Sequence, residues 1–175
     1  MKTAKEFIYP AVFTAMLIGA QLVLSGVTGV EIITVLLLSF TYIFGLKQGF
    51  IVANAFSILR CAIFGFFVNV VFLYLVYYNL FVLAIGFISK VFKKRYTIKI
   101  HVLLTVVAVI LTACFTLIDD VITPLMYSYS AYATKLYFTA SLTVMIPHTI
   151  CSLATVSTLF YPLYRVLKNK WYAVS

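Results

Sequence analysis

The sequence has little charge, and its acidic residues are especially few. Only 10% of its 175 residues are charged, and four of them are aspartate or glutamate, whereas an average soluble domain is about 25% charged. Hydrophobic residues make up 65% of the chain, more than a soluble protein of this length can bury. This excludes a soluble domain and predicts an integral membrane protein that folds as one domain over residues 1–175.

Cysteine is also scarce, and its spacing excludes the common redox and metal motifs. Cys61, Cys114 and Cys151 all lie within apolar runs, and no CxxC pair occurs. We therefore expect three small buried or lipid-facing side chains, with neither a disulfide nor a metal site.

Enzyme motifs are absent as well. The sequence contains no HExxH, GxSxG, GxGxxG or phosphate-binding Walker A stretch. We expect no carboxylate at the depth of His148, which makes it a poor general base; a helix-packing hydrogen bond and contact with a ligand both stay open for it. Asp119 and Asp120 are neighbours, and adjacent side chains at a helix end point apart. We predict no catalytic residue, no metal and no cofactor. The alternatives are a membrane-embedded enzyme that uses Asp119 and Asp120, or a purely structural helix bundle.

Long apolar runs make up most of the chain, and about 20 apolar residues are needed for a helix to cross a bilayer. Because helices satisfy their own backbone groups in lipid, these runs predict an all-α integral membrane bundle of six transmembrane helices. The predicted helices cover residues 7–24, 31–44, 50–67, 70–89, 100–118 and 136–167. The second is short for a full span. We expect a turn at 45–49 and a long polar loop at 119–135.

Basic residues fall on one side of this six-helix plan. Because Lys and Arg are enriched in cytoplasmic loops, the plan predicts that the N and C termini are cytoplasmic. The cytoplasmic side then receives Lys2, Lys5, Lys47, Lys90, Lys93, Lys94, Arg95, Lys99, Arg165, Lys168 and Lys170. The outer side receives Glu31, Asp119, Asp120 and Lys135.

The predicted outer half also holds most of the informative polar residues. Glu31 opens the second helix, where a carboxylate suits the positive end of the helix dipole, so capping and ligand contact are both open. Arg60 lies within a predicted span, and we expect it either to face the bundle interior with a partner or to snorkel outward. Glu31, Asp119 or Asp120 could be that partner, and contact with a ligand is equally open.

Tyrosines crowd the predicted loop at 119–135. An aromatic belt at the lipid interface explains them, and a pocket for a ring-bearing polar ligand explains them equally well. The predicted substrate-binding set is Glu31, Arg60, Asn69, Tyr74, Asp119, Asp120, Tyr127, Tyr129 and Lys135.

Three small residues, Ala11, Ala15 and Gly19, stand four apart in the first helix. This spacing places them in one slanted row on a single face. Such a groove suits a closely approaching helix, either from this chain or from a partner subunit.

Together these features resemble the S component of an energy-coupling factor (ECF) transporter, the small membrane subunit that captures a vitamin. The size and six-helix plan cover the whole chain, and the row of small residues resembles the family's AxxxA contact. The stretch GVEIITVLLLSFTYIFGLKQGF, residues 29–50, resembles the family's loop, second helix and FGxxxG-like turn.

The resemblance implies a high-affinity subunit of a bacterial plasma-membrane importer that binds a micronutrient from outside. It implies as partners a transmembrane coupling subunit, contacted by Ala11, Ala15 and Gly19, and two ABC-type ATPases. The many tyrosine and amide groups favour cobalamin as the substrate. The acidic pair would equally fit an amine-bearing ligand such as queuosine or thiamine.

Overall fold

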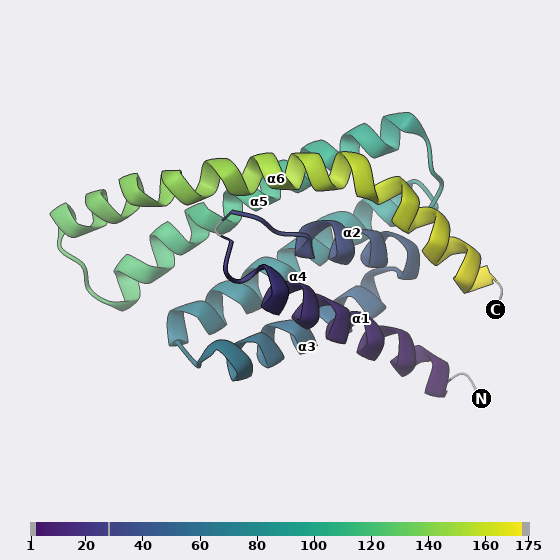
Figure 1. Cartoon of the computed structure of the whole chain (residues 1–175), viewed down its shortest axis with the longest axis horizontal. Coiled ribbons are helices and arrows are strands. Elements are labelled where there is room, and N and C mark those ends of the chain that lie inside the picture. Colours follow the sequence, from purple (N-terminus) through teal and green to yellow (C-terminus); the bar gives the residue numbers. More distant parts are fainter. Residues whose placement is uncertain (1–2, 28, 173–175) are drawn as a thin grey trace.

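The computed structural model describes residues 3–27 and 29–172, with side-chain surroundings for 7–27 and 29–169. Lys2 lies outside the described residues, as do the side chains of Lys5 and Lys170. The described residues form helices and loops without a strand, which confirms the all-α prediction (Figure 1). The helices are α1 (Thr3–Leu24), α2 (Ile33–Phe44), α3 (Leu46–Phe64), α4 (Val68–Val91), α5 (Ile98–Met126) and α6 (Ala131–Tyr172).

Five of these helices, α1 and α3 to α6, are long and apolar enough to cross a membrane by length and composition. Large apolar side chains such as Phe87, Val102 and Ile110 are exposed on the outside of the bundle. Such side chains need no hydrogen bonds and pack well against lipid tails, so lipid would cover this surface. These features are those of a multi-pass membrane protein.

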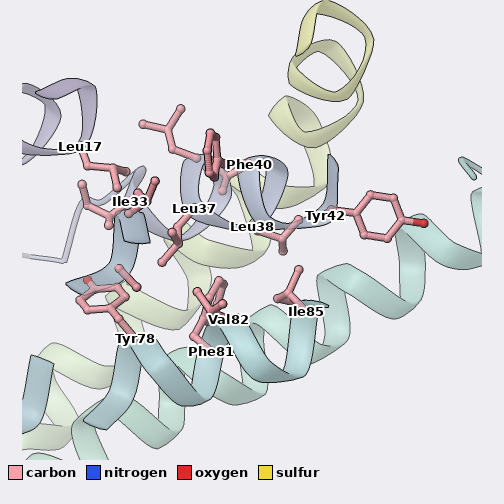
Figure 2. Packing of buried hydrophobic residues seen from close by; sticks show 14 of the residues in the cluster. Leu17, Ile33, Leu37, Leu38, Phe40, Tyr42, Tyr78, Phe81, Val82 and Ile85 are labelled. Atoms are coloured by element: carbon pink, nitrogen blue, oxygen red, sulfur yellow. The ribbon is translucent and has the colours of Figure 1, made fainter. Parts of the chain in front are cut away.

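The short helix α2 lies at the centre of the fold. Its 12 residues are all buried, and it packs against each of the other five helices. At about 18 Å it is shorter than the hydrocarbon core of a bilayer, so it is a buried core helix among five span-length helices. Figure 2 shows Leu37 and Leu38 of α2 close to Phe81 and Val82 of α4. In lipid, whose tails are as apolar as leucine, such side chains stabilise the bundle through close van der Waals packing.

The connection between α2 and α3 is much tighter than the turn expected at 45–49. Gly45 alone separates the two helices, with a φ of 89° that favours glycine. Gly49, expected in the turn, lies in the first part of α3, where an added Cβ would come within 2.8 Å of Thr41 Oγ1. Gly49, the second glycine of GLKQG, therefore allows close helix packing and is not part of the turn.

The long loop expected at 119–135 was wrong. Helix α5 continues to Met126, and α6 already begins at Ala131. Ser130 caps α6, because its Oγ accepts a hydrogen bond from the Ala133 N–H at 3.2 Å. The acidic residues of this stretch therefore lie on a helix, facing the start of α6. Figure 1 shows this α5–α6 hairpin projecting beyond the other helix ends.

Helix α6 is the longest element, with 42 residues. It is about 60 Å long, roughly twice the thickness of a bilayer's hydrocarbon core. Pro147 and Pro162 lie within it, and Figure 1 shows it bending near its C-terminal end. Proline removes a backbone donor and commonly bends a helix at such a point.

The bundle has two chemically different ends. The site end consists of the loops at 25–32, 65–67 and 127–130, and the basic end consists of Gly45, the loop at 92–97 and the two chain ends (Figure 1). The acidic side chains that the structure describes, Glu31, Asp119 and Asp120, belong to the site end. The basic side chains described at the opposite end are Lys47, Lys90, Lys93, Lys94, Arg95, Lys99, Arg165 and Lys168.

Candidate functional site

The loop at 25–32, described for residues 25–27 and 29–32, begins where α1 ends and contacts α6 before α2 starts. Gly29 has a φ of 81°, and an added Cβ would lie 2.9 Å from the Cβ of Pro147. Two hydrogen bonds fix the next turn of the loop: the Glu31 N–H donates to Cys151 Sγ, and the Cys151 S–H donates to the Glu31 carbonyl, both at 3.3 Å. Cys151 is a free cysteine, and it fastens the loop to α6.

Glu31 lies where this loop meets α6. Its Oε2 accepts a hydrogen bond from the Thr34 N–H at 2.8 Å, so it caps the start of α2. Its Oε1 is buried without a hydrogen-bond partner and lies 4.0 Å from His148 Nε2. The prediction that His148 has no carboxylate at its depth was wrong, because the loop folds inward and carries Glu31 to α6.

A cavity of about 400 Å³ lies between this loop and the α5–α6 hairpin. We call it the α5–α6 cavity. Its polar groups include Asp119 and Tyr137, and its apolar wall includes Val30 and Phe115. The imidazole of His148 completes the lining next to the loop. The cavity thus combines a carboxylate, a phenol and an imidazole with aromatic and aliphatic surface.

A second cavity of about 210 Å³ lies on the other side of the loop, among α1, α2 and α4. We call it the α1–α4 cavity. Glu31 lines it together with Gln21 and three tyrosines of α4, Tyr74, Tyr77 and Tyr78. The two cavities have three lining residues in common: Val30, Phe115 and His148. They are therefore neighbours, one on each side of the loop at 25–32.

Asp119 is the centre of a hydrogen-bond network that joins three helices. Its Oδ1 accepts from the Thr123 hydroxyl and its Oδ2 from the Tyr137 hydroxyl, each at 2.7 Å. Asn69 Nδ2 donates to Thr123 Oγ1 at 3.0 Å, and the Tyr127 hydroxyl donates to Asn69 Oδ1 at 3.2 Å. Each polar group in this network has a hydrogen-bond partner in the network. The hydrogen bonds link α4, α5 and α6 beside the α5–α6 cavity.

Asp120 points to a different partner from Asp119. Its Oδ2 accepts from the Ser141 hydroxyl at 2.7 Å, while its Oδ1 is buried without a hydrogen-bond partner. The side chain is only 5% exposed. The two adjacent carboxylates thus contact separate α6 residues, as their positions on one helix would suggest.

Arg60 does not form the expected ion pair with Glu31, Asp119 or Asp120. Among the described residues, no carboxylate oxygen lies within 4.0 Å of its guanidinium. The guanidinium instead lies over two aromatic rings, 4.5 Å from the centroid of Tyr74 and 5.2 Å from that of Phe64. Cation–π attraction offsets part of the cost of holding this charge near the bundle. Because Tyr74 lines the α1–α4 cavity, Arg60 helps to position a wall of the site.

The structure brings three of the nine predicted site residues to the cavities: Glu31, Tyr74 and Asp119. Two others, Arg60 and Asp120, contact a lining residue, and Asn69 is linked to Asp119 through Thr123. The remaining three are exposed near the tip of the hairpin: Tyr127, Tyr129 and Lys135. The prediction omitted several lining residues, above all His148, Phe115, Tyr137 and Gln21. The unusual Pro-His pair within the sixth apolar run was the one available signal for His148.

The row of small residues on α1 faces away from the bundle. Ala11, Ala15 and Gly19 are all exposed, and an added Cβ at Gly19 would meet nothing within 4 Å. The opposite face of the helix, with Phe13 and Leu17, is buried in the core. The sequence left two uses of this row open, and among the described residues it does not serve helix packing within this chain.

Comparison with family models, with curated proteins and with solved structures finds no match to this chain. Within the described residues, no group of three His, Cys, Asp or Glu side chains is placed to hold a metal ion. The site offers carboxylates, phenol hydroxyls and aromatic faces in a concave, largely apolar setting. Such a combination is typical of sites for small organic ligands.

Proposed function

We propose that this chain is the solute-binding subunit of a membrane importer, similar to the S component of an ECF transporter. The observation that carries the proposal is the pair of adjoining cavities on the two sides of the loop at 25–32, at the opposite end of the bundle from the basic cluster. Buried carboxylate oxygen and aromatic rings there give a solute both orientation and contact area.

In this proposal the site end faces the outside of a bacterial cell, and both chain ends are cytoplasmic. The concentration of lysine and arginine at the basic end supports this orientation through the positive-inside rule. The bundle then crosses the plasma membrane, with α2 enclosed by the longer helices. Solute enters from outside through the cavities.

The charges at the site favour a ring-bearing solute that carries an amine. Glu31 presents a buried Oε1 that has no hydrogen-bond partner, and Asp119 lines the neighbouring cavity. The rings of Tyr74 and Phe115 offer faces for stacking or for cation–π contact. Solutes of the thiamine or queuosine type fit this chemistry. Cobalamin, the substrate suggested by the composition, is larger and would require the loop at 25–32 to move so that the two cavities open into one.

The outward-facing row on α1 is the proposed contact with a transmembrane coupling subunit. Ala11, Ala15 and Gly19 leave room for the backbone of a partner helix to approach closely. The sequence contains no Walker A stretch, so in this proposal two ABC-type ATPases supply the energy for import.

A thermal-unfolding panel of vitamins and their precursors on the purified protein tests the proposal. One solute should stabilise the chain by about 4 kcal/mol at a thousandfold excess over its Kd. Glu31→Gln keeps an oxygen that can cap α2 but removes the charge, so it should weaken binding by roughly 1.5–3 kcal/mol. Lys47→Gln, at the basic end, serves as the matched control and should bind as the parent does. A flat response to every solute would contradict the proposal.

A further inference from the structure

A third cavity, of about 410 Å³, lies at the basic end, between the loop at 92–97 and the last turns of α6. We call it the basic-end pocket. It is separate from both site-end cavities and shares no lining residue with them. Arg95 and Thr97 line it from the loop, and Arg165, Lys168 and Asn169 line it from α6.

Aromatic contacts hold the two walls of this pocket together. The ring of Tyr96 lies 4.8 Å from that of Tyr161 and 5.5 Å from that of Tyr164, centroid to centroid. The Tyr164 hydroxyl donates a hydrogen bond to the Lys94 carbonyl at 2.9 Å. The pocket is thus built on packing between the loop and α6, and this packing fixes the backbone from which Arg95, Arg165 and Lys168 line it.

Among the described residues, the lining carries positive charge and no acidic residue. Two guanidinium groups, from Arg95 and Arg165, join the Lys168 ammonium, which donates to the Tyr164 hydroxyl at 2.9 Å. The described acidic side chains all belong to the other end of the bundle. Guanidinium groups present forked donors that match the oxygens of a phosphate, so the pocket suits a phosphate-bearing ligand.

The position of the pocket points to a lipid as the source of that phosphate. The apolar span of α4 ends at Val91, and that of α5 begins at Ile98, so the pocket lies where the apolar spans give way to charged residues. Headgroups occupy this level of a bilayer. Exposed apolar side chains follow two lining residues in the chain, Ile98 after Thr97 and Val166 after Arg165, and they offer a surface for acyl chains next to the charged groups.

We propose that the basic-end pocket binds the phosphate headgroup of an anionic phospholipid in the adjacent leaflet. Arg95 and Arg165 contact the phosphate oxygens, while the tyrosines hold the loop in place. Basic pockets between transmembrane helices suit such headgroups on electrostatic grounds. The proposal does not depend on the solute-binding function, because it concerns the other end of the bundle.

Native mass spectrometry of the full chain in detergent tests this, with phosphatidylglycerol and phosphatidylcholine of identical acyl chains as probes. The parent should retain one phosphatidylglycerol in preference to phosphatidylcholine, and excess inorganic phosphate should not displace it. The double variant Arg95→Gln, Arg165→Gln should bind phosphatidylglycerol about thirtyfold more weakly, from roughly a fivefold factor for each basic residue.

The matched control is Lys47→Gln, Lys90→Gln, which removes two charges from exposed residues at the same end but outside the pocket. It should keep its affinity within about threefold. Equal retention of the two lipids, an equal loss in both double variants, or displacement by inorganic phosphate would overturn the proposal. If the arginine pair fails to fold, the two single variants must each weaken phosphatidylglycerol binding, and unchanged affinity in both would overturn it as well.

Discussion

Replacing Gly29 with alanine should detach the loop at 25–32 from α6 and damage both site-end cavities. Gly29 has a left-handed φ of 81°, and an added Cβ would lie 2.9 Å from the Cβ and 3.1 Å from the Cγ of Pro147. The proline ring is part of a helix and has little freedom to move away. Gly26, in the same loop, has open space around an added Cβ, so Gly26→Ala is the matched control.

The size of the effect follows from two costs. A left-handed conformation costs a non-glycine residue about 1–2 kcal/mol, and forcing an extra methyl into a packed contact typically costs about 1–3 kcal/mol. If the loop moves to avoid both, Glu31 separates from His148. Binding of the solute must then restore the loop, and a penalty of about 2 kcal/mol raises its Kd about thirtyfold.

Two measurements check this prediction: thermal unfolding of the purified variants, and titration with the solute that the panel identifies. Gly29→Ala should lower stability and affinity, whereas Gly26→Ala should stay close to the parent in both. Parental affinity in Gly29→Ala would refute the view that the contact with Pro147 shapes the site. Equal losses in the two variants would assign the effect to loop flexibility in general.

Three further experiments probe the network, the outward row and the topology. Asp119→Asn replaces one acceptor with an NH₂ donor facing a hydroxyl, so denaturant unfolding should show a loss of about 1–3 kcal/mol; unchanged stability would mean that the network contributes nothing. Ala15→Trp should abolish uptake in cells that carry the partner subunits but leave binding by the isolated subunit intact, and loss of both would contradict the docking role. In a cysteine-free background, single cysteines at Ser128 and Asn169 should label from opposite faces of intact cells, with Ser128 outside; labelling from the same face would contradict the proposed orientation.

The helices were largely predictable because apolar runs and glycine breakers mark them directly. The main error, the loop expected at 119–135, arose because Asp119 and Asp120 looked like residues that need water. Their partners, Tyr137 and Ser141, lie on the next helix, and no local pattern shows that these hydroxyls would satisfy the carboxylates. The hydrogen-bonding Ser130 at the start of α6 was the overlooked local signal.

The site was predictable only in part, because it depends on contacts between distant segments. Glu31 and Cys151 are 120 positions apart, yet both backbone groups of Glu31 bond to that thiol. Because this loop folds inward, it places Glu31 next to His148 and makes His148 part of the site. The spacing of residues in the sequence does not predict this fold. Arg60 was likewise assigned carboxylate partners, whereas aromatic rings on its own helix and on α4 were available to it.

The central claim is that one small solute binds in the cavities on the two sides of the loop at 25–32. Native mass spectrometry of the chain, gently extracted from cells supplied with a mixture of micronutrients, tests it most directly. We predict a single adduct of defined mass in a one-to-one complex, and we predict that the double variant Glu31→Gln, Asp119→Asn loses that adduct while remaining folded. A parent chain that carries no solute, or an adduct that the double variant retains at full occupancy, would contradict the claim.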